Sequence, residues 1–151
     1  MRIVSTGVAL IALLLAFPAH AALGGPAASI EADRAQMKGA LQTRQTALYS
    51  VHEIASSSGV MVREYASPAG TVFAVGWEGL FVPDLQQLLG AYFDQYQEGV
   101  KEQKASYVGR RPLNLQLPGL VVQMSGRMRA LRGRAYVPGQ IPVRVKLEEL
   151  R

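Results

Sequence analysis

Residues 48–77 alternate apolar and polar side chains with period two, and this pattern constrains the fold more than any other feature of the chain. It indicates strands separated by turn sequences. The turns are Ser56-Ser57-Ser58-Gly59, with the composition of a hairpin loop, and Ser67-Pro68-Ala69-Gly70, typical of a β-turn. The predicted strands cover residues 48–54, 60–65 and 71–77. Antiparallel sheet is therefore expected at the centre of the fold.

A well-defined helix is predicted directly after these strands. Asp84 is its expected N-cap, and Gln87 completes a capping box. Gly99 is expected to end it. Apolar residues recur at helical spacing along one face: Leu85, Leu88, Leu89, Tyr92, Phe93 and Tyr96.

The strand over 71–77 has one face of large side chains and one of small ones. Phe73, Val75 and Trp77 alternate with Val72, Ala74 and Gly76. We expect the helix to pack closely on the small face.

The N-terminal region is predicted to contribute less to the core. Residues 22–28 are rich in Gly, Pro and Ala, which indicates a flexible leader. Ser29 is a plausible N-cap for a helix whose thin apolar stripe runs from Ile30 through Met37 and Leu41 to Leu48. We expect a loosely attached surface helix, with docking onto a partner as the alternative.

The remaining chain favours more strands. Residues 100–117 are predicted to be a long polar connection, followed by strands over 120–124, 128–137 and 143–147, with Ser125-Gly126 as a turn. The prediction is an α+β domain: an antiparallel sheet of five to six strands packed against one amphipathic helix, with the additional N-terminal surface helix. The expected organisation is 1–21 signal peptide, 22–45 leader and helix, and 46–151 a single domain.

Residues 1–21 have the features of a secretory signal peptide. Arg2 precedes an uncharged apolar run over residues 3–17, and Pro18-Ala19-His20-Ala21 ends in the small-x-small pattern of a cleavage site. The run is shorter than the roughly 20 residues that span a bilayer, and no second run of that length follows. We expect cleavage after Ala21 and a periplasmic or secreted protein with no membrane span, with an uncut anchor as the alternative.

Composition excludes several kinds of chemistry. The chain contains no cysteine, which excludes disulfides, thiol nucleophiles, thiolate metal sites and lipidation after the cleavage site. His52 is the only histidine beyond the signal peptide, and no metal-binding spacing surrounds it. Glu64 and Glu78 are the nearest candidates for acid–base work, although both are better explained as partners of arginines. We assign no catalytic residue, cofactor or metal.

Charge is distributed unevenly along the chain. Residues 22–98 carry four basic and eight acidic side chains, whereas residues 99–151 carry eleven basic and three acidic ones. The candidate anion-binding residues are Arg127, Arg129, Arg132 and Arg134, with Arg110 and Arg111 in the predicted long loop. Arg127 and Arg129 have odd positions and Arg132 and Arg134 even ones, so in one strand all four share a face only if a bulge, for which Gly133 is suited, shifts the register.

The basic half indicates an anionic partner, or else a fold in which the two halves neutralise each other. An acidic protein, an acidic glycan and lipid headgroups are each compatible with an exported protein. Nucleic acid is a poor fit, because the chain is only 7% aromatic and has no recognisable binding module. A non-catalytic interaction or accessory domain is the first hypothesis, and a small cell-envelope hydrolase or ligand-binding enzyme is the alternative.

Four stretches resemble a family of exported proteobacterial proteins known as domain of unknown function 2844. They are Ala22-Leu23-Gly24-Gly25; Val62-Arg63-Glu64-Tyr65 with Ser67-Pro68, Val72-Phe73-Ala74-Val75 and Trp77; Pro83-Asp84-Leu85 through Leu89-Gly90 with Tyr92-Phe93; and Met128-Arg129-Ala130 with Gly133-Arg134-Ala135-Tyr136-Val137-Pro138. The resemblance implies an exported domain of this overall type. It brings no activity with it.

The export prediction has a direct test. Because Pro18 to Ala21 form a cleavable end to the apolar run, protein recovered from the envelope of expressing cells should begin at Ala22 when its intact mass is measured. A mass that retains residues 1–21 would contradict cleavage and favour the uncut anchor.

Overall fold

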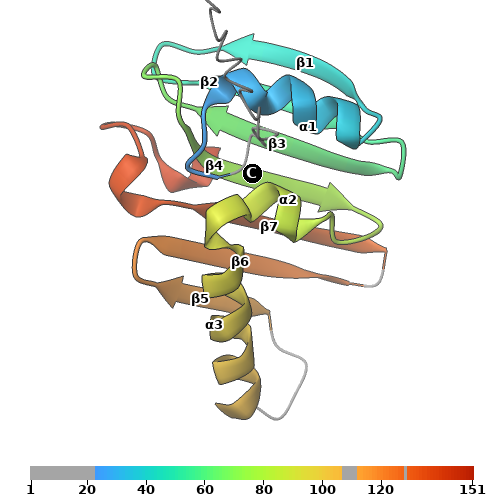
Figure 1. Cartoon of the computed structure of the whole chain (residues 1–151), viewed down its shortest axis with the longest axis vertical. Helices are drawn as coiled ribbons and strands as arrows, with labels where there is room; N and C mark the ends of the chain where they lie inside the picture. Colours follow the sequence, from blue (N-terminus) through green and yellow to red (C-terminus); the bar gives the residue numbers. More distant parts are fainter. Residues whose placement is uncertain (1–22, 107–111, 128) are drawn as a thin grey trace, which may run out of the picture.

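Seven antiparallel strands form one sheet in the computed structural model, which describes residues 23–106, 112–127 and 129–151. They are β1 (Ala40–Gln45), β2 (Ser50–Ala55), β3 (Val60–Ala66), β4 (Val72–Gly79), β5 (Leu113–Leu117), β6 (Leu120–Arg127) and β7 (Ala130–Tyr136). The order across the sheet is β1-β2-β3-β4-β7-β6-β5, so two meanders join where β4 pairs with β7 (Figure 1). The α+β prediction is confirmed, but the predicted strand number was too low, because β1 and β5 had been expected as helix and loop.

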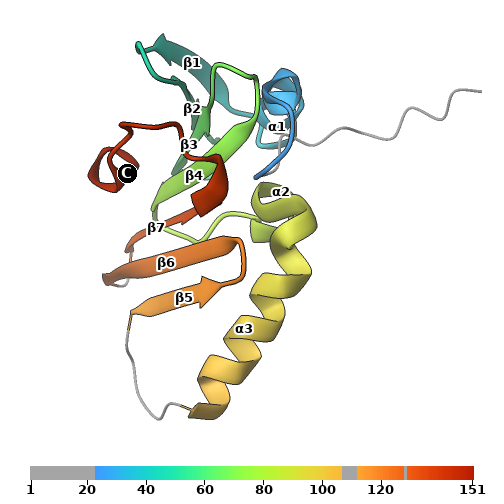
Figure 2. The same cartoon turned by 90° about the vertical axis from the view of Figure 1, so that its left-hand side faces the viewer.

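Helices cover one face of this sheet and the C-terminal segment, residues 138–151, covers part of the other (Figure 2). The helices are α1 (Ile30–Gln36), α2 (Leu85–Leu89) and α3 (Phe93–Ser106). We call the two sides of the sheet the helix face and the tail face. Each face has its own cluster of buried apolar side chains.

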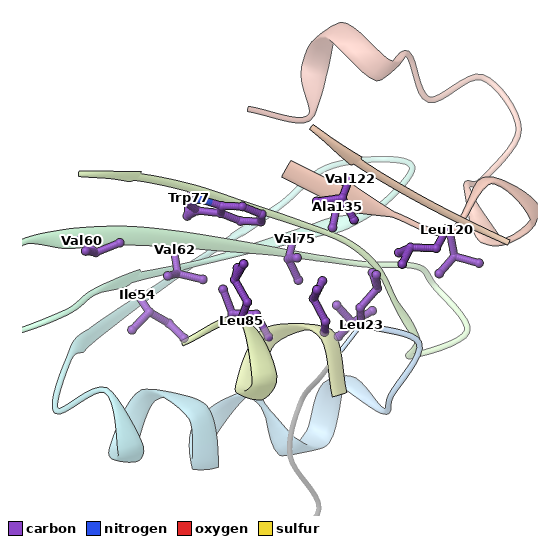
Figure 3. Packing of buried hydrophobic residues seen from close by; sticks show 14 of the residues in the cluster. Leu23, Ile54, Val60, Val62, Val75, Trp77, Leu85, Leu120, Val122 and Ala135 are labelled. Atoms are coloured by element: carbon purple, nitrogen blue, oxygen red, sulfur yellow. The ribbon is translucent and has the colours of Figure 1, made fainter. Parts of the chain in front are cut away.

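On the helix face, Val62, Val75 and Trp77 point toward the helices, and Leu85 of α2 packs beneath them (Figure 3). Full burial of each such side chain contributes about 1.5–3 kcal/mol. On the tail face, Tyr65 and Phe73 lie in a cluster that also contains Tyr49, Val51, Ala74, Tyr136 and Leu150.

A bulge in β4 divides the large side chains of this strand between the two faces. The register passes from Tyr65 opposite Ala74 to Ala66 opposite Val72, so Phe73 has no partner across the strand pair. The expectation that Phe73 shares a face with Val75 and Trp77 was therefore wrong. The helices pack on the face of Val75 and Trp77, whereas the small Gly76 faces the C-terminal segment.

The predicted helix after β4 begins as expected and then breaks. The Asp84 carboxylate accepts hydrogen bonds from the backbone amides of Gln86 and Gln87, at 2.9 and 3.2 Å. Gly90, with φ of 50° and ψ of −120°, ends α2 in a conformation that favours glycine. A short 3₁₀ turn, Gly90–Tyr92, leads into α3, which runs through Gly99. Gly99 was wrongly expected to end the helix; it packs closely against Leu117 of β5.

The N-terminal segment is attached more firmly than its composition suggested. Leu23 is buried in the core of the helix face. The amide of Gly24 donates to the carbonyl of Val72 at 2.7 Å, and the amide of Val72 donates back to Gly25 at 2.9 Å. These bonds fix the segment beside the start of β4, so a flexible leader is not what the described residues form.

The N-terminal helix is shorter than predicted. It ends at Gln36, and Lys38 has a positive φ of 49° that takes the chain out of helical geometry. The chain then enters β1, which pairs with β2 and so extends the sheet. Leu41, predicted on the helix stripe, packs instead against the core from β1.

The C-terminal segment forms 3₁₀ turns, at Pro138–Gln140 and Leu147–Glu149, and not the predicted edge strand over 143–147. Leu150 inserts into the cluster on the tail face. The Tyr65 hydroxyl donates to the carbonyl of Arg151 at 2.8 Å and accepts from its amide at 3.0 Å. Insertion of Leu150 and these side-chain bonds hold the segment across the sheet.

Gly133 of β7 lies directly opposite Trp77, and the indole ring covers it. A Cβ atom at Gly133 would overlap the ring, so we expect Gly133→Ala to lower the free energy of unfolding by about 1–3 kcal/mol. Urea denaturation measures this loss. Gly139→Ala is the matched control, because a Cβ there meets no atom within 4 Å; equal stability of the two variants would contradict the packing described.

Candidate functional site

The register of the β6–β7 hairpin places three of the predicted arginines on the same side of the sheet. Arg127 lies opposite Ala130, and Arg132 and Arg134 follow at every second residue of β7. Residues directly opposite each other in antiparallel strands share a face. All three arginines therefore belong to the tail face.

This arrangement needs no slip in β7. The register runs without interruption through Gly133 on both of its neighbouring strands, so the suggested bulge there is absent. Ser125-Gly126, predicted as the turn, lies within β6. β6 ends at Arg127, so the turn to β7 comes after this residue. The side chains of Arg127 on β6 and Arg132 on β7 therefore lie on the same face of the sheet.

Arg129 lies in the turn between the two strands, with a positive φ of 65°. It is exposed, as are Arg127 and Arg132. None of the ion pairs found among the described residues includes these three arginines. We call Arg127, Arg129 and Arg132 the basic end. Arg110 and Arg111, the other predicted contacts, lie outside the described residues.

Arg134 has an internal role. Its Nε donates to the side-chain oxygen of Gln123 at 2.8 Å, and its Nη1 donates to the carbonyls of Leu147 and, at 3.2 Å, Leu150. The guanidinium also lies 5.9 Å from the ring centroid of Tyr136. Arg134 thus binds the C-terminal segment to the sheet, and its Nε and Nη1 donors are occupied within the fold.

Arg63 is the second arginine with internal partners on this face. It forms ion pairs with Glu53 at 2.9 Å and with Glu78 at 2.8 Å. Glu78 lies directly opposite Arg132 in the register. The expectation that Glu78 pairs with an arginine is confirmed, and Arg63 keeps this carboxylate engaged beside the basic end.

A groove of about 820 Å³ is lined by residues of β4 to β7 and by the end of the C-terminal segment. Gln123, Ser125 and Arg132 line it from the sheet, and Glu148 lines it from the C-terminal segment. The lining combines polar and apolar residues, with charges of both signs. It is a place where a small polar ligand with an anionic group would meet Arg132.

The three side chains considered for acid–base chemistry do not form one cleft. His52 and Glu64 are cross-strand neighbours on the helix face, whereas Glu78 faces the other side. The ring nitrogens of His52 lie 3.2 Å from the Thr43 hydroxyl and 3.0 Å from the Ser50 hydroxyl. Burial lowers the pKa of His52 below its usual value. This geometry favours a histidine held within the sheet.

Glu64 is a buried carboxyl that sequence reasoning had misplaced. It is 0% exposed, beneath α1, and it was expected to pair with an arginine. Burial is the main cause that raises its pKa from 4.5 to about 9, and the charge of Asp33 adds to the shift. Asp33, also buried, accepts a hydrogen bond from the Gln87 side-chain amide at 2.7 Å.

Asp33 lies in the first turn of α1, where the helix dipole favours an acidic side chain. Its spacing from Ile30 and Met37 is i+3 and i−4, so it lies on the apolar stripe of α1. That spacing was the available signal that Asp33 faces the core. Glu64 falls at the same parity as Val60 and Val62, which gave the corresponding signal in β3.

The profile of the family described as Protein of unknown function (DUF2844) matches residues 19–150, nearly the whole chain. The chain belongs to this family. The DUF2844 match begins before Leu23, the first described residue, and ends at Leu150. It therefore includes the N-terminal segment beside β4 and nearly all of the C-terminal segment on the tail face. No match was found among the curated proteins or the solved structures.

Two further observations bear on this DUF2844 domain. Within residues 23–106, 112–127 and 129–151, no helix is long and apolar enough to cross a membrane. The same residues contain no group of three or more His, Asp or Glu side chains placed to hold a metal ion.

Glu64 should make stability depend on pH. Between about pH 4.5 and 9 the folded chain holds a proton that the unfolded chain has lost, so its contribution to stability is complete below pH 4.5 and is lost as pH rises toward 9. The loss is up to about 1.4 kcal/mol per pH unit. We expect Glu64→Gln, which cannot ionise, to flatten this slope in urea titrations at several pH values.

Glu31→Gln is the control, because Glu31 lies on the exposed side of the same helix, in an ion pair with Arg34. This variant should keep the wild-type slope. A wild-type slope in Glu64→Gln would show that Glu64 is not the group that titrates.

Proposed function

We propose that this chain is an exported, non-catalytic interaction domain that binds an anionic partner through the basic end. The observation that carries the proposal is the exposure of Arg127, Arg129 and Arg132 at one end of the sheet, outside every ion pair found among the described residues. Guanidinium groups suit carboxylate and phosphate ligands, because their planar donors can bind two oxygens at once.

The contrast with the other arginines of the tail face supports this assignment. Arg63 and Arg134 are half-buried and each donates to groups of the chain itself. Where an arginine serves the fold, its partners are therefore present. The arginines of the basic end have no such partner among the ion pairs found in the described residues. They belong to the stretch 99–151, which carries eleven basic and only three acidic side chains.

The non-catalytic part of the proposal rests on the separation of His52 and Glu64 from Glu78 by the sheet. General acid–base catalysis requires its groups within hydrogen-bonding reach of one substrate. Glu64 is also fully buried beneath α1. The second candidate, a ligand-binding enzyme, is favoured by one observation, the groove lined by Arg132 and Glu148.

In-cell cross-linking tests the basic end. Arg127→Glu combined with Arg129→Glu should lower the yield of cross-linked partner about tenfold or more, because both reversed charges would repel an anionic surface. Arg44→Glu is the matched control, an exposed arginine on the edge strand β1, several strands away from β6 and β7; it should leave the yield unchanged.

A partner recovered equally with the wild type and with the double variant would overturn the proposal. Far-ultraviolet circular dichroism of both variants would confirm that they fold. Binding of a small anionic ligand that is lost with Arg132→Gln but kept in the double variant would favour the groove as the functional site.

A further inference from the structure

We propose that the anionic partner is a lipid bilayer surface, and that the loop Leu80-Phe81-Val82 inserts into it while the basic end binds lipid phosphates. This inference rests on the proposed function, since it names the partner of the same arginines. The new element is the apolar loop, which the proposed function does not use.

The loop between β4 and α2 exposes three consecutive large apolar side chains. Leu80, Phe81 and Val82 are 46%, 62% and 44% exposed, and among the described residues only Val143 joins them as an exposed large hydrophobic residue. Contiguous exposed apolar groups indicate an interaction site, whereas single ones are ordinary. Their exposure therefore calls for an apolar environment outside the chain.

The fold holds these side chains outward. The sheet ends at Gly79 on one side of the loop, and the capped start of α2 at Asp84 fixes the other side. Trp77 and Leu85 are buried on the helix face next to the loop, and Val82 borders a hollow of about 420 Å³ beside Trp77. Leu80, Phe81 and Val82 are not part of the buried cluster and stay exposed at this end of the sheet.

The basic end lies beside this loop. Gly79 pairs with Leu131, so the end of β4 is level with the β6–β7 turn, and Figure 1 shows both loops at the same end of the sheet. A hollow of about 290 Å³ separates them, lined by Leu80 on one side and Arg129 and Arg132 on the other. Apolar and cationic groups are thus presented together.

Two acidic side chains near this end are engaged by the chain itself. Glu78, which also lines the hollow, is bound by Arg63 at 2.8 Å. The Asp84 carboxylate accepts from the amides that begin α2. The three arginines therefore set the charge that the end presents.

This combination fits a bilayer better than a folded partner. Aromatic and aliphatic side chains lower their free energy among headgroups and acyl chains, and arginines beside them bind phosphate oxygens. The proposed surface lies at the end of the sheet and not along the open edge of a strand. It therefore does not favour a partner peptide that would add a strand to the sheet. With no membrane-crossing helix among the described residues, the attachment would be peripheral.

Vesicle flotation tests the inference. Protein purified from cells that express the full chain should float with vesicles of phosphatidylethanolamine and phosphatidylglycerol at low salt, and not with phosphatidylcholine alone. Arg127→Gln with Arg129→Gln should weaken binding roughly 20- to 30-fold, because each arginine near an anionic surface strengthens it about fivefold. Phe81→Ser should weaken it about tenfold through lost apolar burial.

Two matched variants control for exposed residues elsewhere. Arg44→Gln and Val143→Ser, both at exposed positions away from the basic end, should bind vesicles as the wild type does. Insertion is read with acyl-chain-brominated lipid: a tryptophan introduced by Phe81→Trp should be quenched, and one introduced by Val143→Trp should not. Trp77 is buried and contributes the same background to both.

The outcomes separate this inference from the proposed function. Absence of vesicle binding, or wild-type binding by Phe81→Ser, overturns the lipid assignment. If an arginine-dependent protein or glycan is then cross-linked in cells, the basic end remains a binding surface with a different partner. If neither vesicles nor a cross-linked partner respond to the arginines, both proposals fall.

Discussion

Burial of β4 on both faces is the constraint on which the rest of the structure depends. Residues 72–77 are all buried, although a strand in an antiparallel sheet often leaves one face to solvent. The bulge opposite Tyr65 and Ala66 turns Phe73 to the tail face and leaves Val75 and Trp77 on the helix face. One strand therefore supplies large side chains to both cores and joins the two meanders.

The position of the basic end follows from this central strand. Trp77 lies over Gly133, and this close packing fits the register in which β7 pairs with β4. β7 pairs in turn with β6, and this register places the side chains of Arg127 and Arg132 on the same face of the sheet. At the end of β4 the chain must leave the sheet, and it does so through the exposed loop Leu80 to Val82. Core packing and the proposed interaction surface are consequently parts of one arrangement.

Sequence reasoning succeeded where a local signal and the final environment agree. The period-two pattern located β2, β3 and β4, and the Asp84 cap located the start of α2. It failed where tertiary contacts override local preference. The apolar stripe extending to Leu48 predicted a long helix, yet pairing with β2 makes residues 40–45 a strand. Gly99 looked like a helix end, yet Leu117 packs against it within α3.

The sequence by itself determined the α+β class, the central hairpins, the exclusion of cysteine chemistry and the concentration of basic residues in the second half. These follow from composition and from periodicities within a few residues. Only the tertiary structure decided which arginines remain exposed, because Arg134 and Arg127 share a face and differ only in the distant groups that reach them. It likewise decided the burial of Glu64 beneath α1, since burial depends on contacts between segments far apart in the chain.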